Sequence, residues 1–272
     1  MINPSIHRKL IRNRITIFLI SLLMPGLGYL KIGEIKKFIF TIVLFYTILI
    51  SGVVFGFYSA FAGFVSILLS LSIAHLGSAT HAALKTKVVR PSRTNRFLML
   101  ALTLFFILLT GTGFSNSRTL MGFDRVSMAV PVMEPSIRKG EQVLVDTWIY
   151  KRETPQRGDI IIHSFPGQPG IYLNRIIAVG GDKIEIHEGK TFINGILSTE
   201  RYVNPENAGS EVSIKMELLT VPSNHYFVMG DNRDKSLGDS RFSGTIDLSE
   251  ITGKITCILY SENISRIGTK FE

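Results

Sequence analysis

Four long apolar segments fill the first 114 residues of the chain and limit what this half can fold into. Three of them, residues 38–58, 59–83 and 97–114, approach the ~20 residues that a helix needs to cross the hydrocarbon core of a bilayer. The composition agrees, because 46% of the 272 residues are hydrophobic. We therefore expect residues 1–114 to form an α-helical membrane region.

The remaining apolar segment, residues 15–30, is interrupted by Pro25, Gly26 and Gly28. Because proline and glycine break helices, only about 15 Å of uninterrupted helix remains before the break, at 1.5 Å per residue. This length covers roughly half of the ~30 Å hydrocarbon core. The segment therefore either crosses as a short span or re-enters on the same side, and re-entry requires its non-helical backbone to be buried against neighbouring helices.

Basic residues are concentrated in the same half, which holds 12 Lys and Arg and one acidic residue, Glu34. They form short clusters between apolar segments, a pattern typical of membrane topology rather than of a nucleic-acid-binding face. Lys and Arg near short loops prefer the cytoplasmic side. If residues 15–30 re-enter, all 12 charges are cytoplasmic and residues 115–272 lie outside; if residues 15–30 cross, residues 115–272 lie in the cytoplasm. We prefer the re-entrant topology and expect no nucleic-acid partner.

Residues 115–272 contain short β-type runs instead. The runs are EQVLVDTWIY, DIIIHSF, YLNRIIAVG, KIEIHE, KTFING, HYFVMG and KITCILYS, and Gly, Pro, Asn and Asp separate them. Strands this short need closure or a second layer to bury their apolar faces. We predict an all-β domain, an antiparallel folded sheet or partial barrel, with turns at Glu188-Gly189 and Asn194-Gly195. The stretch ERYVNPENAGSE, residues 200–211, is expected to be a flexible insertion.

Four stretches of the β domain carry a family resemblance. They are VMEPSI (132–137), GDIII (158–162), NRIIAVGGD (174–182) and GDNRDKSLGDSRFSG (230–244). In this order they resemble the conserved boxes of type I signal peptidases, or leader peptidases, the membrane-bound serine proteases that release exported proteins by cutting their signal peptides. The resemblance covers about residues 122–260 and implies a signal peptidase-like fold.

The resemblance places two residue types at the reacting positions that cannot perform the family's chemistry. That chemistry is a Ser/Lys dyad, in which a neutral lysine takes the proton of the attacking serine. Motif alignment puts Val132 at the nucleophile and Asn174 at the base. A valine cannot form an acyl-enzyme, and an amide does not accept a proton near neutral pH. The chain is identified as resembling a catalytically degenerate member, a pseudoenzyme.

The fourth box supplies three supporting positions by the same resemblance. Ser236 corresponds to the family's serine near the catalytic lysine, and Asp239 and Arg241 correspond to a supporting ion pair. The family usually has one residue between that serine and the following Asp-Ser-Arg, whereas this chain has two, Leu237 and Gly238. The spacing leaves the geometry of this loop open.

Peptide binding does not require the dyad. In the family, the segment before the serine and the strand that bears the lysine flank an extended substrate, which adds as a β-strand. By motif position the two sides of this groove are Ala129, Val130, Pro131, Val132 and Met133, and Ile171, Tyr172 and Leu173. For any one of these residues, an ordinary place in the core is the alternative interpretation.

The resemblance implies a multi-pass protein of the bacterial inner membrane with its C-terminal domain outside, at the site of signal peptide processing and protein secretion. We expect it to bind signal peptides of exported preproteins or to partner an active signal peptidase or another secretion or assembly component. Two alternatives remain: an active serine endopeptidase with a displaced nucleophile such as Ser136, and a structural membrane subunit that docks other proteins. No cofactor and no metal is expected, and the single Cys257 excludes an intrachain disulfide.

Overall fold

The computed structural model describes residues 4–85 and 93–271 and divides the chain into two compact units. One unit comprises residues 1–58 and 62–121, and the other comprises residues 59–61 and 122–272. The domain boundary expected after residue 114 falls in the last turn of a helix, Arg93–Ser115.

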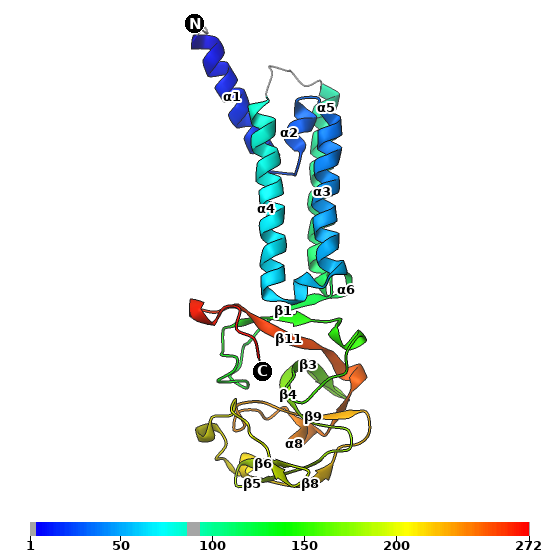
Figure 1. Cartoon of the computed structure of the whole chain (residues 1–272), viewed down its shortest axis with the longest axis vertical. Coiled ribbons are helices and arrows are strands. Elements are labelled where there is room, and N and C mark those ends of the chain that lie inside the picture. The colour runs from blue at the N-terminus through cyan, green and yellow to red at the C-terminus, as the bar shows by residue number, and fades with distance from the viewer. Residues whose placement is uncertain (1–3, 86–92, 272) are drawn as a thin grey trace. The chain divides into compact units, whose positions relative to one another are not determined.

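The first unit is helical. Its elements are α1 (Pro4–Ser21), α2 (Leu27–Lys31), α3 (Ile35–Val54), α4 (Phe61–Leu84), α5 (Arg93–Ser115) and α6 (Ser117–Leu120), with the 3-10 turn η1 (Phe57–Ser59) between α3 and α4 (Figure 1). In the described part of the chain, α3 and α4 are long and apolar enough to cross a membrane, and α5 contains a shorter apolar stretch, Leu100–Gly113. Large side chains on α3 and α4 stay exposed, among them Phe40 (67%) and Ile73 (72%), as expected of helices that face lipid.

The break in the first apolar segment is buried. Met24, Leu27 and Tyr29 pack among the surrounding helices, and α2 lies between α4 and α3 (Figure 1). A Cβ at Gly28 would lie 2.1 Å from Ser21 Oγ, so only glycine allows this close approach. His75 Nε2 bonds the carbonyl oxygen of Ser21 at 2.8 Å, where α1 ends. The burial that a re-entrant segment requires is present, and re-entry itself stays a prediction.

The second unit is the predicted all-β domain, formed by two antiparallel sheets. The larger sheet has the order β1 (Phe123–Ser127), β2 (Gln142–Asp146), β11 (Ile251–Tyr260), β3 (Ile160–Phe165), β4 (Gln168–Val179), β9 (His225–Met229) and β10 (Ile246–Asp247). The smaller sheet has the order β7 (Ile196–Leu197), β6 (Lys190–Ile193), β5 (Lys183–His187) and β8 (Lys215–Thr220). The short helices are η2 (Ile149–Lys151), η3 (Pro205–Asn207), α7 (Glu211–Ile214), α8 (Ser240–Ser243), η4 (Leu248–Glu250) and η5 (Ile264–Arg266).

Both predicted turns are confirmed. β5 and β6 pair across Glu188-Gly189, and β6 and β7 pair across Asn194-Gly195, with positive φ at all four turn residues. The sequence did not predict β1 and β8. β1 is short and largely polar, whereas β8, KMELLT, is rich in residues that favour helices, so its pairing with β5 overrides its local preference.

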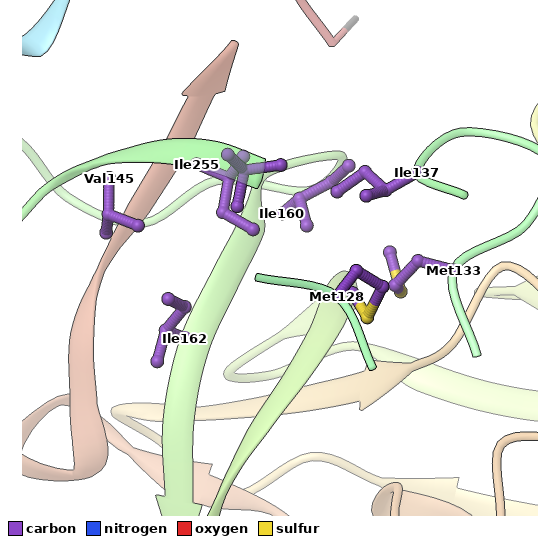
Figure 2. Packing of buried hydrophobic residues seen from close by; sticks show 8 residues of the cluster. Met128, Met133, Ile137, Val145, Ile160, Ile162 and Ile255 are labelled. Atoms are coloured by element: carbon purple, nitrogen blue, oxygen red, sulfur yellow. The ribbon is translucent and has the colours of Figure 1, made fainter. Parts of the chain in front are cut away.

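One apolar cluster of the β domain supports the residues that follow β1. Its buried members come from several strands and from the loop between β1 and β2: Met128, Met133, Ile137, Val143, Val145, Ile160, Ile162 and Ile255 (Figure 2). Val132 and Leu173 are partly buried and pack against it. The loop that carries Val132 is therefore held by the core rather than free at the surface.

Candidate functional site

A cavity of about 400 Å³ lies in the β domain, beside β4. Its lining residues are Val126, Ser127, Met128, Ala129, Val130, Val132, Ile162, Ile171, Tyr172, Leu173, Asn174, Lys235, Ser236, Leu237 and Gly238. Most of this surface is apolar, and a few polar groups converge on it, which is typical of a ligand-binding pocket. Two segments that are more than 100 residues apart in the sequence, residues 126–132 and 235–238, meet here.

The cavity brings together most of the predicted site residues. Both predicted groove segments reach it, through Ala129, Val130 and Val132 on one side and residues 171–173 on the other, together with Asn174 and Ser236. Two predicted groove residues do not line it: Pro131 is half-buried, and Met133 is fully buried in the core cluster because its side chain points the other way. Asp239 and Arg241 lie outside the lining and support the loop that carries Ser236.

Val132 is fixed beside the fourth motif by its backbone. The amide of Asn232 donates to the carbonyl oxygen of Val132 at 3.0 Å. Gly230 makes this approach feasible, because a Cβ there would lie 2.6 Å from that same oxygen and 2.5 Å from Ser236 Oγ. The first and fourth motifs are thus locked together, with an aliphatic side chain at the position where the resemblance implies a nucleophile.

Asn174 lies on β4 and is 1% exposed. Its Nδ2 donates to Ser236 Oγ at 3.3 Å, and Ser236 Oγ also accepts from the amide of Gly230 at 3.2 Å. The Oδ1 of Asn174 lies 2.8 Å from Nε2 of His163 on β3. These contacts form one buried hydrogen-bond chain from His163 through Asn174 to Ser236, and burial makes such a chain costly to break.

The sequence analysis missed His163. Its ring stacks on Tyr172, with centroids 5.9 Å apart, and meets the edge of Phe165 at 4.8 Å. Burial lowers the pKa of His163, although both ring nitrogens face oxygen atoms, Asn174 Oδ1 and the carbonyl oxygen of Ser164. The register of the β3–β4 hairpin, in which His163 pairs with Tyr172, was the signal that would have placed it next to Asn174.

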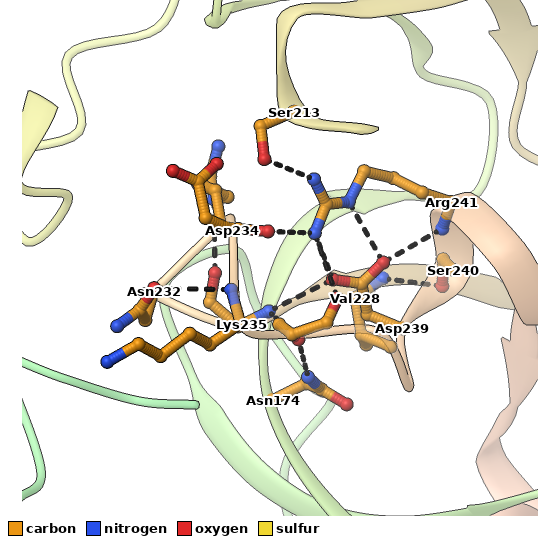
Figure 3. A network of polar contacts seen from close by, with 12 residues as sticks. Asn174, Ser213, Val228, Asn232, Asp234, Lys235, Asp239, Ser240 and Arg241 are labelled. Atoms are coloured by element: carbon orange, nitrogen blue, oxygen red, sulfur yellow. Dashed lines mark hydrogen bonds and ion pairs between the residues drawn. The ribbon is translucent and has the colours of Figure 1, made fainter. Parts of the chain in front are cut away.

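The loop after β9 is held by a buried ion pair (Figure 3). Arg241 donates to both carboxylate oxygens of Asp239, at 3.0 and 2.9 Å, and to the carbonyl oxygens of Arg233 and Ser236, at 2.7 and 3.0 Å. The extra residue in this loop is accommodated by Gly238, where a Cβ would lie 2.7 Å from the ring of Tyr172. Asp239 and Arg241 form the pair that the resemblance implies.

A second buried ion pair joins β4 to the start of the fourth motif. Arg175 donates to both oxygens of Asp231, at 2.9 and 2.7 Å, and to the carbonyl oxygen of Gly158 at 2.8 Å. The same guanidinium donates to Ser136 Oγ at 3.2 Å. Ser136 therefore faces this arginine rather than Asn174, and it does not line the cavity.

The stretch expected to be a flexible insertion is tied to this frame. Arg233 makes a doubly bonded ion pair with Glu200, at 2.9 and 2.7 Å, and the ring of Tyr202 lies 4.0 Å from the guanidinium of Arg175. Because the partners of Glu200 and Tyr202 lie far away in the sequence, spacing did not reveal these roles. Among the described residues, no three His, Cys, Asp or Glu side chains are grouped to hold a metal ion.

Known proteins match the same part of the chain. The family model described as "Signal peptidase, peptidase S26" matches residues 98–260, more than half of the chain. The chain is 32% identical to a thylakoidal processing peptidase 1 of Arabidopsis thaliana over 45% of this chain and 37% of that protein. It is 29% identical to a signal peptidase I of Aquifex aeolicus over 48% of this chain and 73% of that protein. It is 31% identical to a signal peptidase I of Pseudomonas aeruginosa over 40% of this chain and 51% of that protein. It thus spans well under two thirds of the length of two of these relatives.

A crystal structure of a signal peptidase I from Enterococcus faecalis shares 29% identity with the chain, covers 38% of it and 98% of that protein, and gives a TM-score of 0.34. The family match begins within α5 and continues to the end of β11, so it contains every residue of the cavity, while α1 to α4 lie outside it. On the strength of the family match, the chain belongs to the signal peptidase family S26.

Proposed function

We propose that this protein is a membrane-bound signal peptidase homologue of the bacterial inner membrane that binds signal peptides of exported preproteins without cleaving them. The observation that supports the proposal is the cavity itself, which has a mainly apolar lining that includes Val132 and Asn174, the residues that motif alignment assigns to the dyad positions. Neither side chain supplies a nucleophile or a base. A cavity that lacks a nucleophile and a base can still bind a peptide, so binding is the function we propose for it.

The edge of β4 favours an extended peptide as the ligand. Among the described strands, β9 pairs with β4 from Arg175 onward, so residues 171–173 beside the cavity have no strand neighbour on that side. A peptide can add to such an edge through main-chain hydrogen bonds, and its small side chains can enter the apolar cavity. Ile171 is 71% exposed, which leaves it accessible to such a ligand.

Photo-crosslinking tests the binding proposal. Benzoylphenylalanine in place of Ile171 should capture a signal peptide added to the full-length protein, and excess unlabelled peptide should abolish the product. The matched control is the same substitution at Ile264, an isoleucine of the same domain that is 80% exposed and lies outside the cavity lining. Equal capture at both positions, or no capture at Ile171, would reject the proposal.

One observation favours a second candidate function, an active peptidase. Ser127 and Ser236 carry hydroxyl groups in the cavity lining, and Lys235 carries an amine there. Ser236 is fully buried and bonded to Asn174 and Gly230, whereas Ser127 is exposed at the end of β1. Cleavage of a preprotein that is lost in Ser127→Ala or Ser236→Ala would support this candidate. The third possibility, a subunit that only docks other proteins, predicts capture of a partner protein but not of signal peptide.

A further inference from the structure

The helical unit contains a second cavity, outside the residues that match the family. Its volume is about 440 Å³. Its lining residues are Tyr29, Lys37, Phe40, Thr41, Leu44, Ala74, Gly77, Ser78 and His81. The four positions from α3 and the four from α4 each follow the i, i+3, i+4, i+7 spacing of one helix face. Two helix faces therefore line this space, and the α4 face is made mainly of small residues that leave room for a ligand.

The cavity is polar at one end. Lys37 is in the first turn of α3 and His81 is in the last turn of α4, so both lie at the same end of these two helices. The hydroxyl of Tyr29 bonds Nδ1 of His81 at 2.5 Å. Lys37 pairs with Glu34, and Lys85 directly follows the last residue of α4, where its amide donates to the carbonyl oxygen of His81 at 3.1 Å. Two cations thus lie beside one carboxylate, which leaves one positive charge for an anionic ligand.

The wall beyond this end is apolar. Leu44 lies roughly 10 Å further along α3 than Lys37, at 1.5 Å per residue. Phe40, Leu44 and Ala74 line this part. Another cavity, of about 300 Å³, occupies neighbouring positions of the same helices and is lined mainly by apolar side chains such as Phe45 and Leu71. A ligand that fits has an anionic head and a hydrocarbon tail.

We propose that the cavity between α3 and α4 binds an anionic phospholipid, with its phosphate beside Lys37 and Lys85 and an acyl chain along the apolar wall. Basic pockets between transmembrane helices on the cytoplasmic side bind such head groups. The basic clusters that flank α3 and α4 predict that this end of the helices lies on the cytoplasmic side. The proposal is independent of what the β domain binds.

The lipid's two parts are tested with three soluble probes. The full-length protein in detergent is titrated with dioctanoyl phosphatidylglycerol, dioctanoyl phosphatidylcholine and glycerol phosphate, and bound molecules are counted by native mass spectrometry. We expect phosphatidylglycerol to bind at least about tenfold more tightly than phosphatidylcholine, because only the former carries a net charge. Glycerol phosphate, which lacks acyl chains, should not compete. Equal binding of the two lipids, or competition by glycerol phosphate, would overturn the proposal.

Gly77 provides a test of the cavity that does not disturb folding. A Cβ at Gly77 meets no atom of the surrounding structure within 4 Å, and glycine is the least favourable residue inside a helix after proline, so a side chain can be added there. Gly77→Leu should fill the cavity and abolish phosphatidylglycerol binding, whereas Gly77→Ala should retain it. Unchanged binding in Gly77→Leu would contradict the proposed site.

The charges have their own matched control. Lys37→Gln combined with Lys85→Gln should weaken phosphatidylglycerol binding by roughly 30-fold, as expected for two lysines near a lipid phosphate. Lys36→Gln removes the adjacent charge on α3, which is exposed and does not line the cavity, and should change binding by less than about threefold. Equal losses in the two variants would show nonspecific attraction and reject the site.

Discussion

The cavity and the frame around it are built from opposite kinds of residue. The two positions that the motif alignment assigns to the reacting pair hold an aliphatic side chain, Val132, and a neutral amide, Asn174, which is joined to an imidazole whose pKa burial lowers. The frame is held by ion pairs whose acidic partners are almost fully buried, Asp231, Asp239 and Glu200. Charge is thus present where it fixes the loops and absent from the two positions that the motif alignment assigns to the family's reacting pair.

This difference indicates what the chain retains. A buried ion pair that loses one partner leaves an uncompensated charge, so the frame cannot change one residue at a time without a large loss of stability. A buried lysine without a reaction to perform carries only the cost of its desolvation, so its replacement by a neutral amide relieves a cost. We therefore infer that the frame supports a binding cavity.

The largest expected effect is on cleavage activity and comes from introducing the family's Ser/Lys dyad at the two motif positions. In Val132→Ser with Asn174→Lys, burial at position 174 would lower the pKa of the new lysine, so that it could accept the serine proton. We expect the rate of preprotein cleavage to exceed that of either single variant by roughly 10³-fold or more. This would be a partial recovery, because a covalent nucleophile contributes ~10⁶ to turnover. A double variant as inactive as the single ones would show that the frame no longer positions these residues.

Breaking the frame should reduce stability. Arg175→Met leaves Asp231 buried without its partner and should lower the free energy of unfolding by about 3–5 kcal/mol. Arg152→Met is the matched control, because Arg152 is 57% exposed and its contact with Asp146 is 3.4 Å; it should cost less than about 1 kcal/mol. Fluorescence of Trp148, the only tryptophan, reports unfolding of the β domain. Similar losses in both variants would contradict the assigned role of the buried pair.

The smallest expected effect concerns the pH dependence of stability. Since the pKa of folded His163 lies below its ordinary value of 6.5, the unfolded chain binds this proton more readily. The contribution of the neutral ring is therefore complete above pH 6.5 and is lost as the pH falls from 6.5 toward the folded pKa. The stability advantage of the native protein over His163→Gln should shrink between pH 7 and pH 5. His187→Gln, at a half-exposed position, is the control. An advantage independent of pH would refute this assignment.

Sequence patterns predicted the architecture well, because alternation and turn residues are local signals. The turn at Glu188-Gly189 needs only two adjacent residues, and the motif positions identified Val132, Asn174 and Ser236, which the cavity brings together. Contacts between distant segments were not predictable in this way. His163 depends on the register of β3 and β4, and Tyr202 depends on an arginine 27 positions earlier.

The direction in which a side chain points also could not be predicted from the sequence, because it depends on the three-dimensional structure. Met133 was expected in the groove, but it fills the core cluster, whereas its neighbour Val132 lines the cavity. Ser136, considered as a displaced nucleophile, likewise lies outside the cavity lining and accepts a hydrogen bond from Arg175. Helix length alone left open whether residues 15–30 cross or re-enter, because the burial of Met24 and Leu27 depends on contacts with α3 and α5.

Binding and cleavage measured in one reaction test the central claim most directly. The purified full-length protein is incubated with a preprotein, and complex and cleavage products are quantified together by mass spectrometry. We expect a saturable complex that free signal peptide displaces, with no cleavage product beyond that of the preprotein incubated alone. Product that forms with the native protein and disappears in Ser127→Ala, Ser136→Ala or Ser236→Ala would contradict it.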